Sequence, residues 1–222
     1  NKIIFLSLFL MGAVVNSFSQ QIIKKDAEID AMVKEISVDS LAQNLNKLVS
    51  FGTRATLSNQ SSSTKGIGAA RAWILSRFNE YAKSSNGRLS AFIDTITYNA
   101  DKRRVNRPII LGNVVATLKG TDPNDKRIFV ISGHLDSRRS NDMDSVGDSP
   151  GANDDGSGTV AVMECARVMS KHSFPATLIF VTVSGEEQGL LGAYFMANKA
   201  KKENWKIEAV LNNDIMGSNN SN

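Results

Sequence analysis

Cysteine, proline and histidine are scarce in this chain of 222 residues, which holds one, four and two of them. A disulfide scaffold needs paired cysteines, so that class of protein is excluded. The single thiol, Cys165, falls in the apolar run 160–169, where a small buried side chain is expected. No apolar run reaches the roughly 18 residues that a membrane-spanning helix needs, so the sequence predicts no membrane span.

Neither sign of charge dominates the sequence. The 26 Lys and Arg residues against 22 Asp and Glu residues leave a net charge of +4. This charge is too small and too dispersed to predict a nucleic-acid partner. With 41% hydrophobic and 22% charged residues, the composition is typical of a folded globular protein. The length allows one domain of ordinary size or two small ones, and we expect a single core.

The first 19 residues have the pattern of a secretory signal. Lys2 precedes an apolar stretch over 3–15, and Ser17 and Ser19 follow at the spacing of the small residues that a signal peptidase accepts. A buried N-terminal helix is the alternative, but no polar residues alternate with the apolar ones. We therefore expect residues 20–222 to form the folded domain and the protein to be exported, either secreted or periplasmic.

Beyond this signal, the pattern changes from helices to strands that alternate with helices. Residues 25–50 and 69–81 carry apolar side chains at helical spacing. We expect strands at 89–98, 109–118, 127–132, 177–183 and 207–211, and further helices at 159–171 and 189–201. The alternation predicts an α/β fold, with a largely parallel twisted sheet and helices on both faces.

Acidic residues and one histidine follow three of the predicted strands, in the segments GHLDS, GEEQG and NNDIMG, and a fourth polar segment, PGANDDGSG, precedes a predicted helix. The residues concerned are His134, Asp136, Asp154, Asp155, Glu186, Glu187 and Asp214. Because ligands bind outside the carboxyl ends of the strands in open α/β sheets, we expect these side chains to converge on one edge. Crowded carboxylates repel one another, and a divalent metal ion is the usual resolution.

Each segment also has a purely structural interpretation. The acidic residues of GEEQG can complement a helix dipole, NDDGSG can form a capped turn, and His134 can be a satisfied buried histidine. Capping does not explain why acidic residues end three successive buried strands, with one of only two histidines among them. The motif GDSPG at 147–151 matches a serine nucleophile elbow in letters, but no buried strand precedes it and Pro150 follows the serine.

The spacings suit a metal site. His134 and Asp136 share one side of an extended segment, so Asp136 can accept the second imidazole N–H while the other nitrogen binds metal. Glu186 and Glu187 point about 100° apart at a helix start. One of these two can therefore ligate a metal while the other reaches a bound water. A carboxylate such as Asp154 can bridge two ions.

Taken together, SGHLDS, PGANDDGSG, SGEEQGLLGA and LNNDIMG resemble the co-catalytic zinc exopeptidase family, which includes bacterial leucyl aminopeptidases, glutamate carboxypeptidases and glutaminyl cyclases. The resemblance covers 127–217, with weaker similarity in GNVVATLKG and SFGTRAT. It implies a three-layer sandwich of the zinc aminopeptidase type that binds two Zn²⁺ ions.

The resemblance also implies a role for each residue. The implied zinc ligands are His134, Asp154, Glu187 and Asp214. His134 and Asp214 hold one ion, Glu187 holds the other, and Asp154 bridges them. Glu186 is the general base, which takes a proton from the metal-bridging water and passes it to the leaving amine. The resemblance also implies a cis peptide bond after Asp154.

Two further residues are expected to support this chemistry. Asp136 orients the histidine ligand and is counted with Glu186 as catalytic, and Asp155 lies behind the metal ligands. The expected function is that of an exported zinc aminopeptidase acting on peptides with a free N-terminus. The alternatives are a single-zinc glutaminyl cyclase, a carboxypeptidase whose substrate carboxylate binds Arg138 and Arg139, and a non-catalytic binding module on this fold.

The family's second histidine ligand is expected well beyond Asp214. Only eight residues follow Asp214 in this sequence. We therefore expect the catalytic domain to be incomplete at its C-terminus, with the second zinc ion one ligand short. The sequence gives no indication of whether the protein is a monomer or an oligomer.

Overall fold

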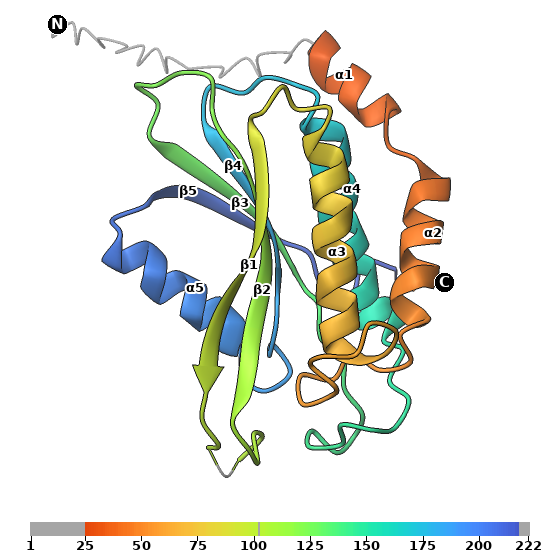
Figure 1. Cartoon of the computed structure of the whole chain (residues 1–222). Helices are drawn as coiled ribbons and strands as arrows, with labels where there is room; N and C mark the ends of the chain where they lie inside the picture. Colours follow the sequence, from red (N-terminus) through yellow and green to blue (C-terminus); the bar gives the residue numbers. More distant parts are fainter. Residues whose placement is uncertain (1–24, 102, 218–222) are drawn as a thin grey trace, which may run out of the picture.

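The computed structural model describes residues 25–101 and 103–217, which form one five-stranded sheet with helices on both faces (Figure 1). The strands are β1 (Leu89–Tyr98), β2 (Ile109–Leu118), β3 (Arg127–His134), β4 (Thr177–Val183) and β5 (Lys206–Asn212). Their order across the sheet is β1-β2-β4-β3-β5. The predicted signal at 1–19 lies outside the described residues.

The sheet has a parallel part and an antiparallel part. Strand β3 pairs in parallel with β4 and β5, whereas β2 pairs antiparallel with both β1 and β4. The connections explain the difference, because a helix joins each pair of successive parallel strands, while a loop at 99–108 joins β1 to β2. The predicted α/β class is confirmed, and the parallel core is the part of the sheet that ends in the polar segments.

The helices form the outer two layers of the sandwich. They are α1 (Ala27–Lys34), α2 (Val38–Val49), α3 (Gly66–Ala82), α4 (Gly158–Met169) and α5 (Leu191–Lys202). Figure 1 shows α2, α3 and α4 on one side of the sheet and α5 on the other. The predicted placement of helices on both faces is therefore confirmed. None of the helices in the described part of the chain has the length and apolar character that a membrane crossing requires.

Strand β4 shows how the sequence builds both layers of the core. Its side chains alternate, so Leu178 and Phe180 join the large apolar cluster under α3 and α4, while Ile179 and Val181 join the smaller cluster that contacts Met196 of α5. A strand buried on both faces needs a continuous apolar run, which is what the sequence TLIFVTV supplies. The two clusters hold the carboxyl end of the parallel strands in a fixed position.

Candidate metal centre

The carboxyl ends of the parallel strands bring a histidine and two carboxylates together. His134 is the last residue of β3, Asp154 lies in the turn at 152–157 before α4, and Asp214 follows β5. The Nε2 atom of His134 lies 3.1 Å from Oδ1 of Asp154 and 3.8 Å from Oδ1 of Asp214. One ligand atom from each of the three residues lies within 4.8 Å of the other two. This spacing is compact enough for all three atoms to reach one metal ion.

The imidazole of His134 is fixed by the main chain. Its Nδ1 atom lies 2.9 Å from the main-chain oxygen of Asp136, whereas the Asp136 carboxylate is 3.7 Å away. Because a carbonyl oxygen can only accept, Nδ1 carries a proton, and in the neutral imidazole the Nε2 lone pair faces Asp154 and Asp214. The sequence analysis expected the carboxylate of Asp136 to accept this proton; the main-chain oxygen of the same residue does so instead. The resulting tautomer is the one that binds metal through Nε2.

The Asp136 carboxylate has another set of partners. It is fully buried and accepts hydrogen bonds from the hydroxyl of Thr56 at 2.8 Å and from the main-chain N–H groups of Glu186 and Glu187, both at 3.2 Å. Asp136 therefore joins the loop after β3 to the loop after β4. This placement holds the Glu186–Glu187 pair next to His134.

Asp155 plays a similar part at the other side of the cluster. Its carboxylate accepts N–H groups from His134 at 2.9 Å, Gly158 at 2.9 Å and Ile215 at 3.3 Å. Burial raises the pKa of Asp155 to about 6, although the charge of His134 and the bonded N–H groups oppose the shift. The peptide bond between Asp154 and Asp155 is cis, as the resemblance implied. Asp155 thus ties together the three segments that carry the cluster.

Glu186 and Glu187 occupy different environments. Oε2 of Glu186 lies 4.0 Å from Nε2 of His134, and 30% of its side chain is exposed. Glu187 was predicted to hold the second ion; it lies outside the His134 cluster, and its Oε2 is 3.0 Å from Nε of Arg138. Burial and the charges of nearby carboxylates, led by Asp154, raise the pKa of Glu187 to about 7. Of the two glutamates, only Glu186 has a carboxylate oxygen within 4.0 Å of the imidazole.

The electrostatics of the cluster favour a bound cation. Burial disfavours the protonated imidazole of His134, but the neighbouring carboxylates, Asp136 first among them, outweigh burial and raise its pKa to about 10. Burial, followed by the charges of Asp136 and other carboxylates, also raises the pKa of Glu186. Concentrated negative charge around one imidazole is the environment that a divalent metal ion neutralises. One imidazole nitrogen and two carboxylate oxygens are a donor set that fits Zn²⁺.

Arg54 was not predicted as a site residue. Its side chain is fully buried, and its guanidinium donates to the main-chain oxygens of Leu135 at 2.8 Å, Pro150 at 2.5 Å and Gly151 at 2.9 Å. Burial lowers the pKa of Arg54 to about 10, against the charges of Asp136 and other carboxylates. At neutral pH this is a buried cation behind the ligand loops. The only indication of Arg54 in the sequence was the weak similarity of its segment, SFGTRAT, to the zinc exopeptidase family.

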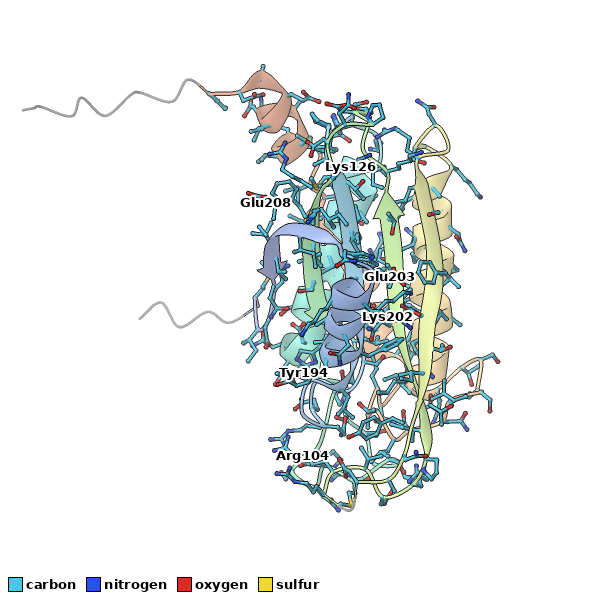
Figure 2. The ribbon with its side chains drawn as sticks, turned by 90° about the vertical axis from the view of Figure 1, so that its left-hand side faces the viewer. Arg104, Lys126, Tyr194, Lys202, Glu203 and Glu208 are labelled. Atoms are coloured by element: carbon cyan, nitrogen blue, oxygen red, sulfur yellow. The ribbon has the colours of Figure 1, made fainter. Side chains whose placement is uncertain are left out.

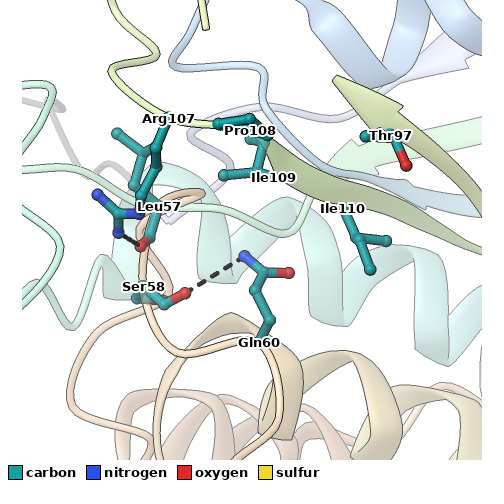
Figure 3. A pocket seen from close by; sticks show the side chains of 8 residues that line it. All are labelled: Leu57, Ser58, Gln60, Thr97, Arg107, Pro108, Ile109 and Ile110. Carbon is teal, nitrogen blue, oxygen red and sulfur yellow. Dashed lines mark hydrogen bonds between the residues drawn. The ribbon is translucent and has the colours of Figure 1, made fainter. Parts of the chain in front are cut away.

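Two other features of the sequence and the surface lie outside the cluster. Ser149 of the GDSPG motif forms an isolated parallel bridge with Thr53, not the end of a buried strand, which agrees with the rejection of a nucleophile elbow. A cavity of about 250 Å³ lies where the loop after α2 meets the first residues of β2 (Figure 3). Arg107 and Gln60 line it, and it contains none of the candidate ligands. It is therefore not a continuation of the metal site.

The sandwich fold, with a histidine and two carboxylates at the carboxyl edge of its parallel strands, defines an α/β protein with a candidate metal centre. Residues 113–222 match the model of peptidase family M28, and the chain belongs to this family. A probable zinc metalloprotease of Leptosphaeria maculans is 46% identical over 87% of this chain, and one of Pyricularia oryzae is 44% identical over the same share. The chain spans 44% and 38% of the lengths of these two curated relatives.

Solved structures show the same fold. The LapA aminopeptidase of Legionella pneumophila superposes with a TM-score of 0.64 and 25% identity, covering 86% of this chain and 48% of LapA. The glutaminyl cyclase of Porphyromonas gingivalis superposes with a TM-score of 0.64 and 18% identity, covering 81% of this chain and 61% of the cyclase. The similarity to the cyclase is one of fold alone, whereas the sequence relatives are named as zinc metalloproteases.

Proposed function

We propose that the protein is an exported zinc-dependent aminopeptidase that hydrolyses the first peptide bond of peptides with a free N-terminus. The observation that carries the proposal is the grouping of His134, Asp154 and Asp214, with Oε2 of Glu186 only 4.0 Å from the imidazole. The similarity to probable zinc metalloproteases in sequence and to the LapA aminopeptidase in structure supports the same class of reaction.

His134, Asp154 and Asp214 are the residues that would hold a zinc ion. We expect two ions in the complete protein, with Glu187 and Asp154 contributing to the second. Bound zinc supplies a Lewis acid that polarises a carbonyl and makes water a better nucleophile. The buried Asp136 and Asp155 keep the ligand segments in place through the hydrogen bonds described above.

Glu186 is the proton carrier in this proposal. Burial, followed by the charges of Asp136 and other carboxylates, raises its pKa, while the charge of His134 opposes the shift. A carboxylate with a raised pKa is a stronger base, so Glu186 can accept a proton from the attacking water. The same carboxyl group then donates that proton to the leaving amine. Its partial exposure lets it face both the cluster and an incoming substrate.

Matched peptides with free and acetylated N-termini test the substrate class. The complete gene product, supplied with Zn²⁺, is expected to remove residues stepwise from the free N-termini only, and a chelator is expected to stop the reaction. Mass spectrometry follows the products. Cleavage of the acetylated peptide, or of neither peptide, contradicts the aminopeptidase proposal.

The variant Glu186→Gln tests the base assignment. It keeps the shape of the side chain but removes the proton acceptor, so turnover is expected to fall by about 10²- to 10⁴-fold. Zinc content, measured by elemental analysis, is expected to stay unchanged. Glu187→Gln is the matched control, because it makes the same substitution one residue away and is expected to lower zinc content. Loss of zinc in Glu186→Gln contradicts the assignment.

A glutaminyl cyclase is the second candidate, because the His134 cluster is a ligand set for a single ion. A peptide that begins with glutamine separates the two activities. Cyclisation lowers its mass by one ammonia, whereas aminopeptidase action removes the whole residue. The carboxypeptidase alternative loses support, since Arg138 and Arg139 form ion pairs with Glu187 and Asp144.

Export is proposed from the pattern of residues 1–19 alone. A secreted or periplasmic protein is expected to lose this segment. N-terminal sequencing of the protein recovered outside the cytoplasm tests the proposal, and a mature N-terminus close to Gln20 is the expected result. Retention of residues 1–19 contradicts it.

A further inference from the structure

Two arginines from separate loops meet at Glu187. Nε of Arg138 lies 3.0 Å from Oε2 of Glu187, and its Nη1 lies 2.6 Å from Oδ1 of Asp142. Nε of Arg104 lies 3.1 Å from the other oxygen of Asp142, and its Nη1 donates to the main-chain oxygen of Glu187 at 2.8 Å. The guanidinium of Arg138 therefore bridges two carboxylates, and Arg104 supports one of them.

This network lies at the end of the molecule that carries the cluster. Figure 2 places Arg104 at the opposite end from Lys126, which directly precedes β3. Strand β3 runs from that end to His134, so its carboxyl end points toward the end with Arg104. The loop at 99–108, the loop after His134 and the loop after β4 thus share one set of ion pairs.

The contact determines what the Glu187 carboxylate can do. Only 11% of the Glu187 side chain is exposed, so few other groups can reach it. Its oxygens do not join the group of His134, Asp154 and Asp214, and one of them is bound to a cation supplied by the protein itself. A guanidinium and a divalent ion are alternative partners for the same carboxylate oxygen.

We propose that Arg138 is a positioning residue that competes with a metal ion for Glu187, and so controls how tightly the site holds zinc. The proposal rests on the proposed zinc site. When zinc takes Glu187, Arg138 keeps its second partner, Asp142, and the guanidinium does not become an isolated charge. Arg104 limits how far Asp142 can move, which keeps Arg138 within reach of Glu187.

Zinc titration against a chromophoric chelator tests the proposal with the complete gene product. Arg138→Gln is expected to tighten zinc binding by about three- to tenfold, because it removes both the competing partner and a nearby positive charge. Arg139→Gln is the matched control, since it makes the same substitution one residue away, where the partner is Asp144. It is expected to change the affinity by less than about twofold. Arg138→Lys, which keeps the charge, is expected to restore wild-type affinity.

A double variant shows whether Arg138 acts through Glu187. In a Glu187→Gln background, the gain from Arg138→Gln is expected to shrink to that of Arg139→Gln. The proposal is overturned if Arg138→Gln still tightens zinc binding by the full amount in that background. It is also overturned if Arg138→Gln binds zinc no more tightly than Arg139→Gln does. Neither result contradicts the zinc site itself. Failure of the wild-type protein to bind zinc overturns the zinc site and this proposal with it. Arg138 is 41% exposed, so its substitution is not expected to prevent folding.

Discussion

The carboxylate of Asp136 accepts the main-chain N–H of Glu186 at 3.2 Å, although 50 residues separate the two in the sequence. The same carboxylate accepts the N–H of Glu187 and the hydroxyl of Thr56. Because both oxygens of this carboxylate accept hydrogen bonds, an asparagine at position 136 would point its NH₂ group at one of these donors. The position of the glutamate pair beside His134 therefore depends on a negatively charged residue at 136.

Replacement of Asp136 by asparagine tests this dependence. The new amide presents N–H toward the N–H groups of the loop after β4, so the loop is expected to move and zinc affinity to fall by about 10- to 100-fold. Chelator competition measures the affinity. Asp148→Asn makes the same substitution at an exposed position in the neighbouring loop and is expected to have no effect. Equal affinities for the two variants contradict the role given to Asp136.

Removal of the Arg54 guanidinium is expected to destabilise the fold. Arg54→Met keeps the length of the side chain but removes the buried guanidinium that donates to the main-chain oxygens of Leu135, Pro150 and Gly151. The free energy of unfolding is expected to fall by about 3 to 5 kcal/mol, as measured by urea denaturation. Arg103→Met, at an exposed position, is expected to cost less than about 0.5 kcal/mol. A loss below about 1 kcal/mol for Arg54→Met contradicts its structural role.

The pKa shifts of the cluster predict how pH changes the effect of zinc. The pKa of His134 is raised from 6.5 to about 10, so its contribution to stability is present below pH 6.5 and is lost as the pH rises to 10. The pKa of Asp155 is raised from 3.8 to about 6, and that of Glu187 from 4.5 to about 7. Their contributions to stability are therefore lost over these same pH ranges. In the absence of zinc, these three groups therefore destabilise the folded protein as the pH rises.

Zinc binds the deprotonated forms of its ligands, so it offsets that loss. The increase in Tm on adding Zn²⁺ is expected to be larger at pH 8 than at pH 5.5. Differential scanning fluorimetry with and without a chelator measures both increases. An equal increase at the two pH values contradicts the assignment of titrating groups to the zinc site.

The strands were the part of the fold most accessible from the sequence. Apolar runs such as TLIFVTV predicted β4 with its observed bounds, because both faces of a central strand are buried. Helix starts were less accessible: α2 is capped by Ser37, whose Oγ accepts from the N–H of Ser40, and two further polar residues, Asp39 and Ser40, lie within three positions of this cap. Several polar residues in a row can each act as a cap, and periodicity alone does not choose among them.

Convergence of the site followed from one topological rule. His134, Asp154 and Asp214 meet because parallel strands end at one edge, and this needed no knowledge of distances. The partner of Glu187 could not be predicted in this way, because Arg138 reaches it from a loop whose conformation no pattern determines. Arg54 was missed for a related reason: its partners are main-chain oxygens, which leave no trace in side-chain spacing.

Zinc binding by His134 is the most direct test of the proposed site, because the chain has only two histidines. His172 lies away from the cluster, with Nε2 3.0 Å from Oε1 of Glu35, and so provides a matched control. Zinc titration is expected to give equal affinities for the wild type and His172→Ala, and an affinity weaker by more than about 100-fold for His134→Ala. Unchanged zinc affinity in His134→Ala, or equal losses in the two variants, contradicts the proposed metal centre.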